Sequence, residues 1–142
     1  MQILRFNCTP ALAKIAAFAA LRWNKALRCR VLAPEPSAVI ADIMITFGTV
    51  DRSHDYERVA ECRRRHDVIF IVLASDVKWS VTFWQRFLGL GEQDALAALL
   101  HECGHALGLP HSDLFSDVMH DELGSTVIST DEAARYRAFL NI

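Results

Sequence analysis

Apolar residues recur every three or four positions over residues 10–28, which predicts an amphipathic helix with one buried face. Thr9 and Pro10 mark its start, because threonine is a good capping residue and proline suits the first turn. We expect a folded helix here and not a cleaved signal peptide, since Lys14 interrupts the apolar run. The residues expected on its buried face are Leu12, Ile15, Ala16, Ala19, Trp23 and Leu27.

Two further apolar runs predict β-strands. "ADIMITFG" (residues 41–48) is a strand that ends at a glycine. "DVIFIVLA" (residues 67–74) is almost continuously apolar, which indicates burial on both faces. "CRVLA" (residues 29–33) is a shorter candidate before a proline-rich break, and the polar residues 49–66 give no clear pattern.

Two more helices are predicted in the second half, over residues 93–107 and 129–139. Ser129 and Glu132 have the spacing of a capping box, which starts the last helix. Helix, strands, helix, irregular segment and helix in this order predict an α+β fold with the helices packed on one sheet. No repeat or linker divides residues 1–142, so we expect a single domain.

The composition excludes several classes of protein. The 142 residues are 52% hydrophobic and 23% charged, as in globular proteins, and carry a net charge of −2. We therefore expect no nucleic-acid partner, no membrane partner and a monomer. Without a convincing signal peptide, we expect synthesis in the cytoplasm. None of the four cysteines forms a CxxC pair, which argues against a cysteine-only zinc site, and Cys103 is expected to be a small buried residue.

The segment "LLHECGHALGLPHS" (residues 99–112) holds the candidate chemistry. His101 and His105 are four residues apart on one side of the predicted helix, roughly opposite its apolar stripe, so both rings can reach one ion. Gly108 is placed to end the helix, and the chain can then turn and bring His111 back. Three neutral imidazoles form a zinc site with one open position, the arrangement of catalytic zinc.

His101, Glu102, His105, Gly108 and His111 spell HExxHxxGxxH, which resembles the zinc signature of the metzincin metalloproteases. "HSDLFSDVMH" after the helix is similar to the matrixin branch, and the resemblance implies that Met119 forms the turn beneath the histidines. The resemblance extends to "AFAALRWNKAL", "ADIMITFG", "DVKWS" and "STDEAARYRAFL". It implies a small twisted mixed sheet with an N-terminal helix, a zinc-site helix, a methionine turn and a C-terminal helix.

The resemblance also implies an activity, namely hydrolysis of a protein or peptide substrate by a zinc-activated water. Zn²⁺ would be held by His101, His105 and His111, Glu102 would be the general base, and a substrate would add to a sheet edge near residues 58–62. We expect one catalytic zinc without structural zinc or calcium, although His54, Asp55 and His66 lie in residues 49–66. Matrixins usually act outside the cell. A chain that is made in the cytoplasm and then released, or delivered to a target cell, would fit both this location and the lack of a signal peptide.

Two alternatives stay open. The chain could be a binding module that keeps a zinc site without catalysis, although a structural site needs no general base such as Glu102. It could also be a zinc hydrolase that acts on a non-protein amide, for example in peptidoglycan.

Overall fold

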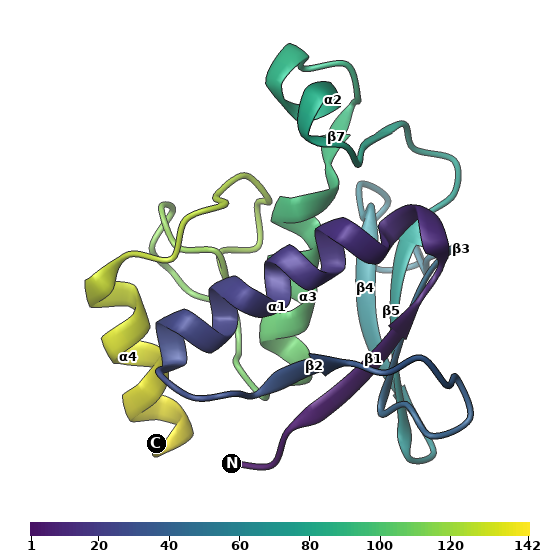
Figure 1. Ribbon diagram of the computed structural model, residues 1–142. Coiled ribbons are helices and arrows are strands. Elements are labelled where there is room, and N and C mark those ends of the chain that lie inside the picture. Colours follow the sequence, from purple (N-terminus) through teal and green to yellow (C-terminus); the bar gives the residue numbers. More distant parts are fainter.

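A computed structural model describes residues 1–142 and has a mixed five-stranded sheet covered on one face by helices (Figure 1). Strands β1 (Leu4–Cys8), β2 (Leu32–Pro34), β3 (Ile43–Gly48) and β5 (Val68–Ala74) run parallel, and β4 (Ala60–Arg65) is antiparallel to β5. The order across the sheet is β2-β1-β3-β5-β4, which makes β2 and β4 the edges.

Three longer helices complete the fold. A 3₁₀ turn at Pro10–Leu12 leads into α1 (Ala13–Leu27), and α3 (Ala95–Ala106) and α4 (Thr130–Leu140) follow in the second half. The short elements β6 (Trp79–Ser80), α2 (Phe83–Leu88) and β7 (Gln93–Asp94) lie between β5 and α3. In Figure 1, α2 projects from the top of the molecule, and none of its residues is buried. None of the helices is long and apolar enough to cross a bilayer.

The α+β class and the main elements confirm the sequence predictions. All six residues expected on the inner face of α1 are buried, and so is Cys103. Residues 71–74 of β5 are buried in succession, as a strand covered on both faces requires. The candidate strand at residues 29–33 is shifted to Leu32–Pro34, and residues 93–94 belong to β7 rather than to the helix.

Two strands of the five-stranded sheet and one helix escaped prediction, as did the short strands β6 and β7. β1 precedes α1, so a strand and not a helix comes first; Leu4, Phe6 and Cys8 alternate with Arg5 and Asn7, a pattern that favours a strand and was missed. β4 occupies part of the ambiguous residues 49–66, because its pairing with β5 compensates for a polar sequence. α2 is apolar at Phe83, Trp84, Phe87 and Leu88, but its six residues are too few to show a helical period, and all four side chains are exposed.

The two predicted helix starts are only partly correct. Thr9 precedes the first turn, but its hydroxyl makes no capping hydrogen bond. Ser129 does cap α4 and accepts from the Glu132 N–H at 3.1 Å. The Glu132 carboxylate, however, does not return to Ser129; it accepts from the Val118 N–H at 2.7 Å, because that buried donor has no partner in its own loop.

The core is densest where α1, α3 and the segment around Met119 meet. Trp23 of α1 is fully buried, and its indole N–H donates to the Leu100 carbonyl of α3 at 2.9 Å. Gly104 of α3 faces both Trp23 and Met119. A Cβ at this position would overlap the Met119 sulfur and approach the Trp23 ring to 3.0 Å. The absence of a side chain at Gly104 therefore lets Met119 pack directly under α3.

Gly104→Ala should destabilise the protein by about 1–3 kcal/mol, since overpacking at a buried site outweighs the better helix propensity of alanine. Gly124→Ala is the matched control, because a Cβ there would meet nothing within 4 Å. Urea denaturation of both variants measures the difference. Equal stability of the two variants would show that Met119 does not pack tightly against α3.

Candidate metal centre

α3 carries the first two histidines of the candidate metal centre on its C-terminal half. The sequence predicted them opposite the buried stripe, but α3 is buried on nearly all sides. His101 is only 3% exposed, and Glu102 only 5%. The two side chains are buried because α3 packs against α1, β4 and β5, and the Val118 carbonyl lies against His101.

Gly108 ends the helix as predicted. Its φ of 101° lies in the region that favours glycine, and the Leu109 N–H donates to the Gly104 carbonyl at 2.9 Å. The chain reverses here, so that His111 returns to the rings of α3. The three histidines then offer nitrogen atoms that all lie within 4.8 Å of one another.

Hydrogen bonds set the protonation of two of these rings. The Nδ1 of His101 lies 2.9 Å from the Val118 carbonyl, and the Nδ1 of His105 lies 2.8 Å from the Leu109 carbonyl. A carbonyl oxygen only accepts, so Nδ1 carries the proton in both rings and Nε2 carries a lone pair. Burial also lowers the pKa of His101 to about 4, which keeps the ring neutral.

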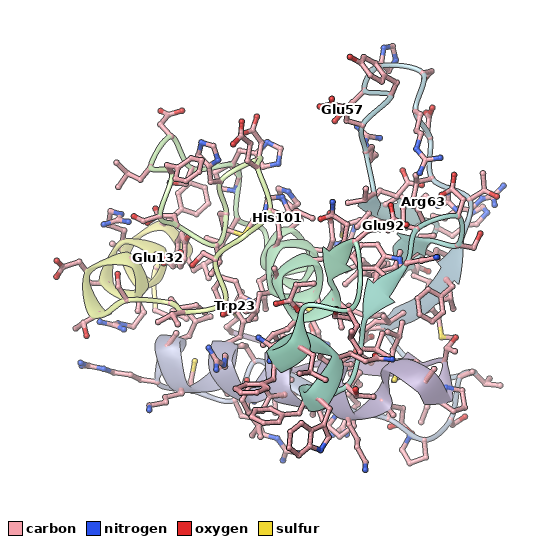
Figure 2. All side chains as sticks on the ribbon, turned by 90° about the horizontal axis from the view of Figure 1, so that it is seen from above. Trp23, Glu57, Arg63, Glu92, His101 and Glu132 are labelled. Atoms are coloured by element: carbon pink, nitrogen blue, oxygen red, sulfur yellow. The ribbon has the colours of Figure 1, made fainter.

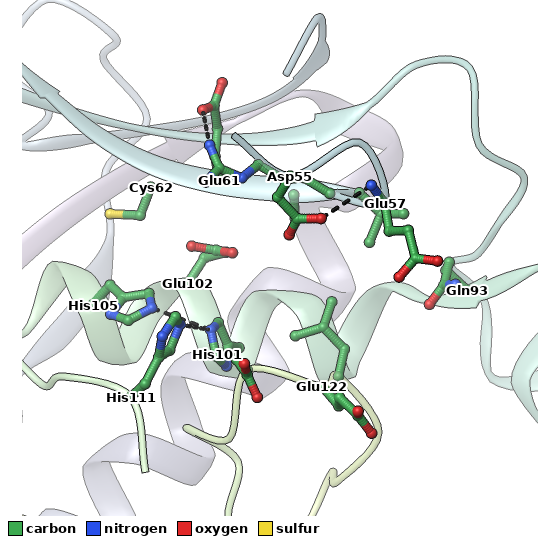
Figure 3. Close-up of a pocket in the computed structure, with 15 residues that line it drawn as sticks. Asp55, Glu57, Glu61, Cys62, Gln93, His101, Glu102, His105, His111 and Glu122 are labelled. Atoms are coloured by element: carbon green, nitrogen blue, oxygen red, sulfur yellow. Dashed lines mark hydrogen bonds and ion pairs between the residues drawn. The ribbon is translucent and has the colours of Figure 1, made fainter. Parts of the chain in front are cut away.

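These lone pairs face one another. The Nε2 of His101 lies 3.1 Å from that of His105 and 3.2 Å from that of His111 (Figure 3). Two unprotonated nitrogens at this distance repel unless a cation lies between them. In tetrahedral zinc sites with Zn–N bonds of 2.0–2.1 Å, neighbouring nitrogens are about 3.3 Å apart. The donor set and its spacing therefore fit Zn²⁺.

The loop beneath the histidines is fixed from α4. Met119 is fully buried, and its carbonyl accepts from the Ser112 N–H at 2.9 Å. Asp117 accepts from the Ser112 hydroxyl at 2.6 Å and from the Arg135 guanidinium at 2.7 Å. The Glu132 carboxylate of α4 accepts from the Val118 N–H. Because the Val118 carbonyl orients the His101 ring, α4 helps to fix that ring.

Asp117 and Glu132 are the site residues that sequence reasoning missed. No pattern singles out Asp117, and the capping-box spacing of Glu132 indicated a local partner. Both carboxylates are almost fully buried, and their partners are known only once α4 is placed beside the methionine turn.

A cleft of about 630 Å³ opens over the histidines, with Glu102 inside it. Figure 3 shows Glu102 pointing from α3 toward β4, with Cys62 nearby on that strand. Burial raises the pKa of Glu102 to about 7, and the neighbouring Glu61 contributes to the shift, whereas Arg58 opposes it. Burial also raises the pKa of Cys62 to about 12, so its sulfur stays a thiol.

The histidine triad is the one group of histidine, cysteine and acidic side chains that is arranged to hold a metal ion. His54, Asp55 and His66 do not form a second such group; whether the chain binds a second ion stays a prediction. The four cysteines are unpaired.

Fold and site together define an α+β domain of the metallopeptidase type, with a histidine triad that could bind zinc. The sequence model of the Matrixin family matches residues 10–134, which is most of the chain. The chain therefore belongs to the matrixin family. A comparison with curated proteins found no significant match.

His111→Ala should abolish stable zinc binding, because it removes one of three protein ligands, while the exposed position should leave the fold intact. Elemental analysis of the wild-type protein should find about one zinc ion per chain. His54→Ala is the control, since His54 lies outside the triad. Two tightly bound zinc ions, or loss of zinc in His54→Ala, would mean that residues 49–66 hold a metal.

Proposed function

We propose that this matrixin is a zinc-dependent endopeptidase. The observation that carries the proposal is the convergence of three imidazole nitrogens, two of them fixed as unprotonated donors, beside a buried carboxylate in one open cleft. When bound, zinc would polarise the scissile carbonyl and make a water molecule more acidic.

Glu102 is the proposed general base. It would accept the proton of the attacking water on its carboxylate and pass that proton to the leaving amine. Its place in the cleft, beside the three histidines, suits this role. The carboxylate forms no hydrogen bond to another side chain that would compete for the proton.

β4 is the proposed substrate-aligning strand. It is a sheet edge, and residues 59–62 line the same cleft as the histidines, where the sequence had indicated a substrate strand near residues 58–62. An extended peptide can pair with an edge strand through main-chain hydrogen bonds, which hold it along the cleft without regard to its side chains.

Acidic residues around the cleft suggest a substrate preference. Besides Glu102, the lining has five carboxylates and one cation, Arg58, which itself pairs with Glu61 at 3.6 Å. Figure 3 shows Asp55 and Glu57 on the β4 side of the cleft and Glu122 on the opposite side. Such a field favours peptides with lysine and arginine beside the scissile bond.

The two alternatives make different predictions. A binding module would hold zinc and cleave nothing, and the buried Glu102 would then have no task in the site. A hydrolase of a non-protein amide would be active on peptidoglycan fragments and inactive on peptides. Assays of both substrate types on the zinc-loaded protein distinguish these cases from an endopeptidase.

Glu102→Ala and Glu102→Gln should keep zinc and lose about 100- to 10,000-fold in peptide hydrolysis, because a general base contributes that much. Glu92→Ala, which removes a carboxylate outside the cleft, should retain wild-type activity. Fluorogenic peptide assays on zinc-loaded proteins provide the comparison. Undiminished hydrolysis by Glu102→Gln would rule out its role as base.

Peptides flanked by lysine should be cleaved about tenfold more efficiently than peptides flanked by glutamate, and the ratio should shrink as salt is added. Glu57→Gln combined with Glu122→Gln should bring the cleavage efficiencies of the two kinds of peptide closer together, whereas Glu92→Gln should leave their ratio unchanged. Measurement of kcat/KM at low and high ionic strength checks this. A ratio that is insensitive to salt would argue against an electrostatic preference.

A further inference from the structure

A second hollow lies at the junction of α1 and α4. These helices lie side by side at one end of the molecule in both views (Figures 1 and 2). The hollow has a volume of about 540 Å³ and is bordered by the end of α1, residues 127–130 and one side of α4. Four of the ten lining residues are basic, and none is acidic. They are Arg22, Lys25, Arg28 and Arg137.

The charges of these four residues are not neutralised within the protein. None of them takes part in the seven ion pairs of the structure, which use other arginines and His120. The charge pattern of the chain strengthens the local excess: residues 1–34 contain six lysines and arginines and no acidic residue, although the whole chain has a net charge of −2. Unpaired cations that converge on one hollow repel one another, and an anion would relieve that repulsion.

Two of the basic side chains are held in place by main-chain carbonyls. Arg137 donates to the Ala26 carbonyl at 2.6 Å, and Arg22 donates to the Thr126 carbonyl. Each guanidinium has five N–H groups, so further donors of both residues can face a ligand. Lys25 and Arg28 form no side-chain hydrogen bond, and their cationic groups are free to move onto a ligand.

We propose that this hollow binds a ligand with several linked phosphate groups. Its volume exceeds that of a single phosphate ion and lies in the range of small-molecule sites. Four cations match the charge of a di- or triphosphate at neutral pH, and the planar arginine groups suit the paired oxygens of phosphate. The site lies apart from the histidine cleft, shares no lining residue with it and does not depend on the proposed peptidase activity.

The distribution of charge over the surface differs from what the net charge of the chain suggests. The net charge of −2 led to the expectation that the chain has no nucleic-acid partner. The charges are segregated, however, with acidic residues around the histidine cleft and basic residues at the hollow between α1 and α4. The same phosphate chemistry could come from a free polyphosphate or from a lipid headgroup, and the experiment distinguishes the two sources.

Isothermal titration calorimetry with inorganic triphosphate tests the site on the whole chain, both zinc-loaded and zinc-free. We expect one binding site per chain with an affinity that falls as salt is added. Lys25→Gln combined with Arg28→Asn should weaken binding about tenfold or more. Neither side chain holds another part of the fold, and asparagine tolerates the left-handed backbone of Arg28, whose φ is 57°.

Arg64→Gln combined with Arg65→Gln is the matched control, since it removes the same charge from exposed residues of β4 outside the hollow. Cosedimentation with phosphatidylcholine vesicles that contain phosphatidic acid forms the second arm. Binding in either arm supports the site when the Lys25/Arg28 variant loses that binding and the control variant keeps it. Binding of triphosphate points to a free polyphosphate, and binding of vesicles points to a lipid headgroup. Equal loss in both variants, or no binding at low salt in either arm, would overturn the proposal.

Discussion

The structure is organised around the convergence of three imidazole nitrogens on one position that can hold a metal ion. The Nε2 atoms of His105 and His111 lie 3.1 and 3.2 Å from that of His101, and hydrogen bonds on the opposite ring nitrogens keep at least two of them unprotonated. A metal site needs its donor atoms aimed at one point, so the rest of the fold must hold the rings in place.

Separate parts of the chain contribute to this support. The Leu109 carbonyl, placed by the turn at Gly108, orients His105, and the Val118 carbonyl orients His101. Val118 is in turn held by Glu132, while Met119 fills the space that Gly104 leaves beneath α3. α4 is far from the zinc motif in the sequence, yet through Glu132 and Asp117 it stabilises the loop on which the metal centre rests. The hydrogen bonds of ligand rings to carbonyls and carboxylates commonly set ligand orientation in metal sites.

The sequence predicted the features that depend on local spacing. His101 and His105 follow from the helical period, the return of His111 follows from Gly108, and the apolar runs of β3 and β5 identify the centre of the sheet. Features that depend on distant partners were not predictable. β4 is polar and becomes a strand only beside β5, and the first half of a capping box at Ser129 gave no sign that Glu132 would bind Val118 instead. The acidic lining of the cleft is likewise formed by residues 55–61 and 121–122, which only the fold brings together.

X-ray absorption spectroscopy at the zinc edge tests the central claim most directly, because it counts the ligand atoms around the metal without reference to activity. Three imidazole nitrogens at about 2.0–2.1 Å, one further oxygen and no sulfur are the predicted shell. A sulfur scatterer at about 2.3 Å would place a cysteine such as Cys62, the thiol that lines the cleft, on the metal, and would contradict a centre built from the three histidines alone.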